Sequence, residues 1–108
     1  MDDETTIGQM KADAAKFYDD RGWNHDPKDL AISTAIESAE LLEIFRFRSG
    51  EEVKELLKDP EFSKSLRDEI SDVALNLLGL AHACGIDMSE AFTQKMRENV
   101  KRYPAKPE

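Results

Sequence analysis

Two pairs of acidic residues, each set in apolar sequence, are the side chains best suited to do chemistry in this chain. Glu37 and Glu40 form one pair, and Glu69 and Asp72 form the other. Residues three apart on a helix share one face, with Cβ atoms about 5–6 Å apart, so each pair can hold a common ligand. If the two helices lie antiparallel, the four carboxylates converge. A cluster of oxygen ligands without imidazole suits a hard divalent cation, and we expect Mg²⁺ at all four residues, with Mn²⁺ as a substitute.

The sequence around Glu37 and Glu40 distinguishes this pair from ordinary solvent-exposed acidic residues. Asp and Glu number 23 among 108 residues, so acidic pairs at this spacing also arise on solvated faces. Glu37 and Glu40, however, lie among large aliphatic residues, with no cationic residue within one turn. Carboxylates buried in such a helix cost several kcal/mol each unless a cation meets them. A metal site is therefore favoured over a solvated face.

The elements that position these pairs are indicated by helix start and stop signals. Capping patterns favour helix starts at Thr6, Asp26, Asp59 and Asp87. They predict helices over residues 6–20, from 27 to 49–50, over 51–57, from 60 to Gly85, and from 87 to Pro104. No alternating apolar pattern predicts a strand. The sequence therefore predicts an all-α bundle of four to five helices.

The length and the apolar pattern bear on how the bundle builds a core. A chain of 108 residues is near the size at which one core only just suffices, so we expect a single domain over residues 1–108, with 105–108 as a flexible tail. The helix carrying Glu37 is apolar on most sides, and the helix carrying Glu69 has one continuous apolar face. We therefore expect oligomerisation to complete the core.

Charge and cysteine content exclude several classes of protein. The net charge of −8 argues against binding to a nucleic acid polymer or an anionic membrane. Cys84 is the only cysteine, so no intramolecular disulfide forms, and we expect it at a helix end within the core. The start of the chain is acidic, unlike a secretory signal, and no uncharged run is long enough to span a bilayer. We expect a soluble, cytoplasmic protein.

Two further groups of residues allow a functional interpretation beside a structural one. Lys95, Asn99 and Arg102 form a mostly cationic stripe at helical spacing, although such a stripe is commonly a solvated face. Trp23 could stack on a nucleobase, with Phe47 sharing that role, or could plug one end of the bundle. The residues alone leave both interpretations open.

The acidic pairs stand within a longer pattern that covers most of the chain. It runs from Arg21-x-Trp23 and His25-x-Pro27, through Glu37-x-x-Glu40 and Glu69-x-x-Asp72, to Lys95-Met96-x-x-Asn99-x-x-Arg102-Tyr103-Pro104. This pattern resembles the MazG-like all-α nucleoside triphosphate pyrophosphohydrolases, and most closely their dCTP pyrophosphatase subgroup with its integron-borne relatives. The chain departs from the wider family at Ile36, where glutamate is usual, and from the subgroup at Asn76, where tyrosine is frequent.

The resemblance implies a role for each residue of the pattern. Glu37, Glu40, Glu69 and Asp72 would bind Mg²⁺, and Glu37 or Glu40 would be catalytic by orienting the attacking water. The implied substrate-binding residues are Trp23, His25 and Phe47 at the base, Asn76 at the sugar or base, and Lys95, Asn99, Arg102 and Tyr103 at the triphosphate or sugar.

The resemblance also implies a reaction and an assembly. Water would attack the α-phosphorus of a dNTP, dCTP or a related one, giving a nucleoside monophosphate and pyrophosphate in house-cleaning of the nucleotide pool. The assembly would be a homo-oligomer, a tetramer built from dimers, with its sites at subunit interfaces.

Two alternatives from other classes remain. A non-catalytic helical interaction or regulatory protein would use the acidic clusters for partner recognition and would need no magnesium. A metal-dependent hydrolase of another phosphorylated metabolite would share the metal site but would not need Trp23 and Phe47.

Overall fold

The computed structural model describes residues 1–23 and 25–107, and all regular structure within them is helical. The helices are α1 Ile7–Asp20, α2 Pro27–Phe45, α3 Gly50–Leu56, α4 Pro60–Ala83 and α5 Met88–Arg102. No strand occurs in this described part of the chain. The all-α prediction is confirmed. Glu108, at the end of the expected tail, lies outside the described residues.

The helix starts predicted from capping patterns are confirmed. Thr6 and Gln9 form a complete capping box, with Thr6 Oγ1 accepting from the Gln9 N–H at 3.0 Å and Gln9 Oε1 accepting from the Thr6 N–H at 2.7 Å. The carboxylates of Asp26, Asp59 and Asp87 accept backbone N–H groups at the starts of α2, α4 and α5. These bonds satisfy amides that have no partner within the helix.

The predicted end of the second helix is wrong. α2 stops at Phe45, several residues before Ser49, and α3 then begins at Gly50. Phe47 adopts φ 63°, a left-handed conformation that no α-helix can include. Ser49 caps the new helix, because its Oγ accepts the Glu52 N–H at 3.1 Å. The left-handed backbone at Phe47 and the cap at Ser49 therefore separate α2 from α3.

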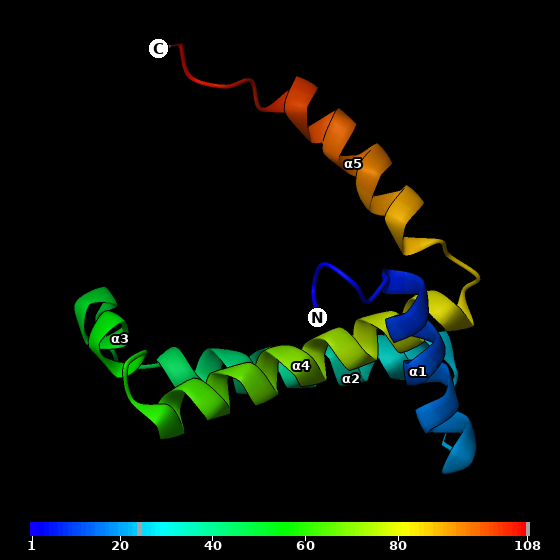
Figure 1. Ribbon diagram of the computed structural model, residues 1–108, viewed down its shortest axis with the longest axis horizontal. Helices are drawn as coiled ribbons and strands as arrows, with labels where there is room; N and C mark the ends of the chain where they lie inside the picture. The colour runs from blue at the N-terminus through cyan, green and yellow to red at the C-terminus, as the bar shows by residue number, and fades with distance from the viewer. Residues whose placement is uncertain (24, 108) are drawn as a thin grey trace.

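Two antiparallel helices form the body of the chain. Figure 1 shows α2 and α4 side by side, joined through α3 at one end, with α1 crossing the other end. The 19 residues of α2 span about 28 Å. The middle of α2, where Glu37 and Glu40 lie, therefore faces the middle of α4, where Glu69 and Asp72 lie. The hairpin meets the geometric condition set out above for convergence of the acidic pairs.

Gly79 of α4 allows α1 to pack closely. A Cβ built on Gly79 would lie 2.5 Å from Cε2 of Tyr18, so the tyrosine ring rests directly on the α4 backbone. Gly79→Ala is expected to lower the free energy of unfolding by about 1–2 kcal/mol, because overpacking costs about 1–3 kcal/mol while the better helix propensity of alanine restores up to about 1 kcal/mol. Chemical denaturation measures this difference.

Gly8 provides the matched control for this substitution. It is also helical, but a Cβ there would meet only Thr6 Oγ1, at an ordinary 3.7 Å. Gly8→Ala is therefore expected to leave stability unchanged or to raise it by about 0.5 kcal/mol. Equal effects of the two substitutions would show that Tyr18 does not pack against Gly79 as described.

A large apolar surface stays uncovered within one chain. α5 projects away from the α2–α4 hairpin (Figure 1), and Phe92 and Val100 on it are 64% and 66% exposed. On α4, Ile70 and Leu77 are also exposed. Cys84, expected within the core, instead caps the end of α4 and is exposed. None of the described helices is long and apolar enough to cross a membrane.

Candidate functional site

Three of the four predicted metal ligands come together between α2 and α4. Glu37, Glu40 and Glu69 each present a carboxylate oxygen, and these oxygens lie within 4.8 Å of one another. Glu37 and Glu69 are half-buried, and Glu40 is exposed. The i, i+3 spacing on α2 and the antiparallel pairing with α4 produce this arrangement, so the cluster follows from the sequence pattern.

The electrostatics of the cluster suit a cation. Burial raises the pKa of Glu37 above its usual 4.5, and the charge of Glu40, a hydrogen bond with Glu40, and the charges of Asp72 and Glu69 raise it further. Burial also raises the pKa of Glu69, followed by the charges of Glu40, Asp72 and Asp68. Glu37 Oε2 and Glu69 Oε2 are buried without a hydrogen-bond partner in the described chain. A cluster of oxygen donors with unpaired buried atoms fits a hard divalent cation such as Mg²⁺.

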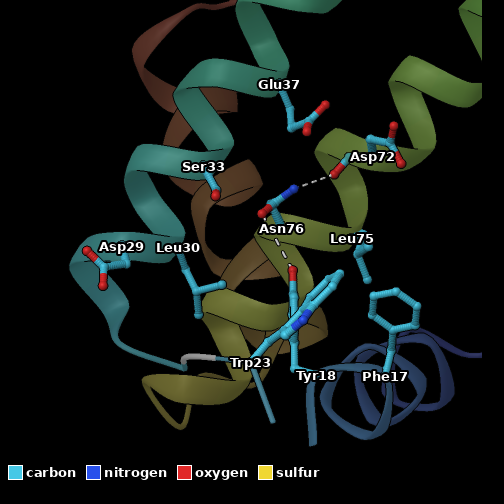
Figure 2. Close-up of a pocket in the computed structure, with 10 residues that line it drawn as sticks. All are labelled: Phe17, Tyr18, Trp23, Asp29, Leu30, Ser33, Glu37, Asp72, Leu75 and Asn76. Atoms are coloured by element: carbon cyan, nitrogen blue, oxygen red, sulfur yellow. Dashed lines mark hydrogen bonds between the residues drawn. The ribbon is translucent and has the colours of Figure 1, made fainter. Parts of the chain in front are cut away.

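Asp72, the fourth predicted ligand, lies at the edge of this cluster. It stands outside the group of three oxygens within 4.8 Å, but its charge contributes to the raised pKa of both Glu37 and Glu69. Asp72 and Glu37 also line the same pocket, and Figure 2 shows both at one end of it, on facing helices. Asp72 therefore lies beside the carboxylate cluster and lines the same pocket as Glu37.

The pocket beside the cluster has an aromatic end and an acidic end. Its volume is about 460 Å³, within the range of small-molecule sites. Trp23, Tyr18 and Phe17 line one end, and the Phe17 and Trp23 rings meet edge to face at 5.3 Å. Glu37 and Asp72 line the other end (Figure 2). A ligand with an anionic group held through a metal and with a flat ring would match both ends.

Asn76, predicted to contact substrate, lies in the wall between these two ends. Its Nδ2 donates to the Asp72 carbonyl oxygen at 2.9 Å, and the Tyr18 hydroxyl donates to its Oδ1 at 3.5 Å. Burial, and then the charge of Glu37, raise the pKa of Tyr18. Tyr18 and Ser33 also line this pocket, and neither was predicted from the sequence. Gly79, a glycine inside the α4 sequence, was the available signal, because a helical glycine often marks close packing of another element.

The structure separates Phe47 from the other residues expected at the base. Trp23 lies just before α2 and Phe47 just after it, so the length of α2 lies between them. Phe47 is 90% exposed, and the Arg46 guanidinium lies 4.6 Å from its ring centroid. His25 lies near the aromatic end, where its Nε2 is 2.8 Å from Asp19 Oδ1 and its ring meets Tyr18 edge to face. One chain does not bring Phe47 to Trp23.

The predicted phosphate-binding stripe is also remote from the acidic cluster within one chain. Lys95, Asn99, Arg102 and Tyr103 lie on or just after α5, which projects away from the hairpin (Figure 1). Lys95 Nζ lies 3.4 Å from Glu98 Oε2, and the Arg102 guanidinium lies 5.3 Å from the Tyr103 ring centroid. Lys95 and Arg102 therefore contact neighbouring residues of their own segment rather than the acidic cluster.

The raised pKa values give an expected pH dependence of metal binding. A carboxyl group whose pKa is raised by folding favours the unfolded state while it is charged. Without metal, the free energy of unfolding should therefore rise as pH falls through the raised pKa values of Glu37 and Glu69. Mg²⁺ needs the charged form. The magnesium-induced rise in Tm is therefore expected to be largest at neutral pH and to shrink on acidification. Thermal melts with Mg²⁺ or EDTA over a pH series measure it, and a pH-independent shift would contradict it.

Comparison with known proteins places this chain in a family. Residues 32–108 match the MazG-like family. Mouse and human proteins named dCTP pyrophosphatase 1 are each 33% identical to the chain, over 103 and 104 residues and 94% of its length. A crystal structure of a pyrophosphatase from Archaeoglobus fulgidus DSM 4304 superimposes with a TM-score of 0.81 at 39% identity, covering 92% of this chain and 93% of that one. The chain therefore belongs to the MazG-like family.

The extent of these matches differs between the relatives. The chain spans 61% of the length of the mouse and human proteins, whereas it covers nearly all of the archaeal chain. The family resemblance found in the sequence motifs is thus confirmed over most of the chain.

Proposed function

We propose that this protein is a magnesium-dependent nucleoside triphosphate pyrophosphohydrolase that cleaves a dNTP, dCTP or a related nucleotide, to a dNMP and pyrophosphate. One observation carries the proposal: a cluster of oxygen ligands opens onto a pocket whose far end is aromatic. The names of the mouse and archaeal relatives support the same chemistry. The role would be cytoplasmic house-cleaning of the nucleotide pool, performed by one catalytic domain over residues 1–108.

The carboxylates and the aromatic residues would have separate roles. Glu37, Glu40, Glu69 and Asp72 hold the metal, and Glu37 or Glu40 accepts a hydrogen bond from the attacking water and so orients it. When bound, Mg²⁺ neutralises charge developing on the phosphate oxygens and acidifies water. Trp23 offers its face to the base, which excludes water from that end of the pocket. His25 holds this aromatic end in place through its contacts with Asp19 and Tyr18.

A complete site would need more than one chain. Because Trp23 and Phe47 lie at opposite ends of α2, a base pocket that contains both takes Phe47 from a second copy. Phe47 is suited to this, since it is almost fully exposed and is held in a left-handed conformation that costs about 1–3 kcal/mol. Lys95, Asn99, Arg102 and Tyr103 would likewise meet the triphosphate through association of chains.

The dimensions of the chain support this assembly. Its radius of gyration is 16.7 Å, against about 13 Å for a compact domain of this length. It exposes 8571 Å², whereas a compact monomer of 12.3 kDa exposes about 6,100 Å². The excess is of the size that obligate oligomers bury. We propose a homo-oligomer, with a tetramer built from dimers favoured.

The test is pyrophosphate release from a panel of dNTPs and NTPs, with and without Mg²⁺, by wild type and by Trp23→Ala. Magnesium-dependent release that Trp23→Ala weakens through KM supports the proposal. Release that is insensitive to Trp23 would favour a hydrolase of another phosphorylated metabolite. No release from any nucleotide by a folded oligomer would overturn the proposal and favour a non-catalytic interaction protein.

A further inference from the structure

Tyr18 is tightly packed in the wall of the pocket, and the proposed chemistry gives it no role. The residue is 5% exposed, and its ring lies against the α4 backbone where Gly79 lacks a side chain. Phe17 and His25 meet the ring edge to face, with centroids 6.0 and 5.6 Å away, and Trp23 lies 6.1 Å away. Because the ring is enclosed on several sides, its hydroxyl has little freedom to leave the pocket wall.

The hydroxyl of Tyr18 meets one end of the Asn76 amide. An amide side chain has two N–H donors and an oxygen with two lone pairs. Asn76 donates one N–H to the Asp72 carbonyl at 2.9 Å, and its Oδ1 receives the Tyr18 hydroxyl at 3.5 Å, the long limit of a hydrogen bond. Figure 2 shows the nitrogen toward Asp72 and the oxygen toward Tyr18. This orientation leaves one N–H and one lone pair for a ligand.

Asn76 lies at the level where the sugar of a nucleotide would pass. It is one helical turn from Asp72, about 6 Å along the α4 axis. A nucleotide with its α-phosphate at the carboxylates and its base at Trp23 would place its pentose between them, beside Asn76 (Figure 2). A sugar hydroxyl both donates and accepts hydrogen bonds, so it complements the two groups that the amide has left.

We infer that Tyr18 is a positioning residue which, seated against Gly79, orients the Asn76 amide toward the 3′-hydroxyl of the nucleotide sugar. The inference rests on the proposed function and deepens it, because it names the part of the substrate that this wall of the pocket recognises. Tyr18 acts through Asn76 and touches none of the reacting atoms. Its removal should therefore alter recognition of the sugar rather than the chemical step.

The test compares the best dNTP of the panel with its 2′,3′-dideoxy counterpart. Wild type is expected to prefer the 3′-hydroxyl by about 3- to 10-fold in kcat/KM, the effect of one hydrogen bond. Tyr18→Phe keeps the ring against Gly79 and removes only the hydroxyl. It is expected to bring this preference to about 1- to 2-fold, mainly through KM for the dNTP. Asn76→Ala should do the same, and the double variant should lose nothing more.

The possible outcomes distinguish failure of this inference from failure of the proposed function. If Tyr18→Phe or Asn76→Ala retains the wild-type preference, the inference is wrong although magnesium-dependent cleavage persists. If wild type cleaves no nucleotide, the proposed function fails and the inference fails with it. A merely structural role for Tyr18 would lower Tm and would affect both substrates equally, which also contradicts the inference. Melting curves on each variant identify that case.

Discussion

Glu40→Gln is expected to lower magnesium-dependent pyrophosphate release by about 10²- to 10³-fold or more. Glu40 is one of three residues whose carboxylate oxygens lie within 4.8 Å of one another, and a bound metal contributes several kcal/mol of transition-state stabilisation. Glutamine keeps the shape of the side chain but removes the charge that holds a divalent cation. The measurement is kcat/KM with saturating Mg²⁺, together with the magnesium-induced change in Tm.

Glu40→Gln should preserve or raise the Tm of the metal-free protein, although it lowers activity. The charge of Glu40 contributes to the raised pKa of Glu37 and Glu69, so its removal relieves repulsion. Without metal, Glu40→Gln should therefore melt at or above the wild-type temperature, while losing most of the rise that Mg²⁺ produces. Loss of activity together with a lower metal-free Tm would instead indicate damage to the fold.

Glu43→Gln is the matched control on the same helix. Glu43 is exposed, lies outside the cluster, and pairs with Arg46 at 3.2 Å. The substitution makes an identical chemical change one turn further along α2, and surface pairs of this kind contribute about 0–1 kcal/mol to stability. Activity should stay near that of wild type. Equal losses in both variants would contradict the assignment of the metal site to the cluster.

Phe92→Asp on α5 is expected to dissociate the assembly and abolish activity together. Phe92 is 64% exposed and lines a hollow with Met96 and Val100, which one chain leaves open. A charge buried there would cost several kcal/mol in an interface between copies. Separated chains would lack the second copy's Phe47 and cationic stripe. Light scattering after size exclusion, with pyrophosphate release on the same fractions, measures both effects.

Gln94→Asp places the same new charge on α5 away from this hollow. Gln94 is exposed and bonds only Glu90 on its own helix among the described residues. It should retain both assembly and activity. An active, monomeric wild-type protein would overturn the oligomer proposal directly, and an active Phe92→Asp monomer would show that α5 does not complete the site.

Local signals explain which parts of the fold could be predicted. Asp26, Asp59 and Asp87 cap helices through bonds to residues two or three positions away, so their sequence neighbours suffice. The approach of Glu37 to Glu69 needs only an antiparallel pairing in addition. Capping signals therefore predicted a bundle of four to five helices, and the i, i+3 spacing predicted the approach of Glu37, Glu40 and Glu69.

An unusual backbone conformation and contacts between distant residues explain what was missed. The end of α2 depends on the backbone of Phe47, which its residue type does not favour. The place of Tyr18 depends on a space at Gly79, on another helix. The surroundings of Cys84 and of the α5 face are not determined by the apolar pattern, because a pattern shows that a face must be covered but not by which element.

Trp23, which lines the pocket, provides an intrinsic fluorescence signal from that site. It is the only tryptophan in the chain, it is 53% exposed, and the Phe17 ring stands against it. All tryptophan emission therefore originates at the aromatic end of this pocket. A ring that stacks there changes the solvent exposure and quenching of that single emitter, so occupancy can be followed by intrinsic fluorescence without a label and without turnover.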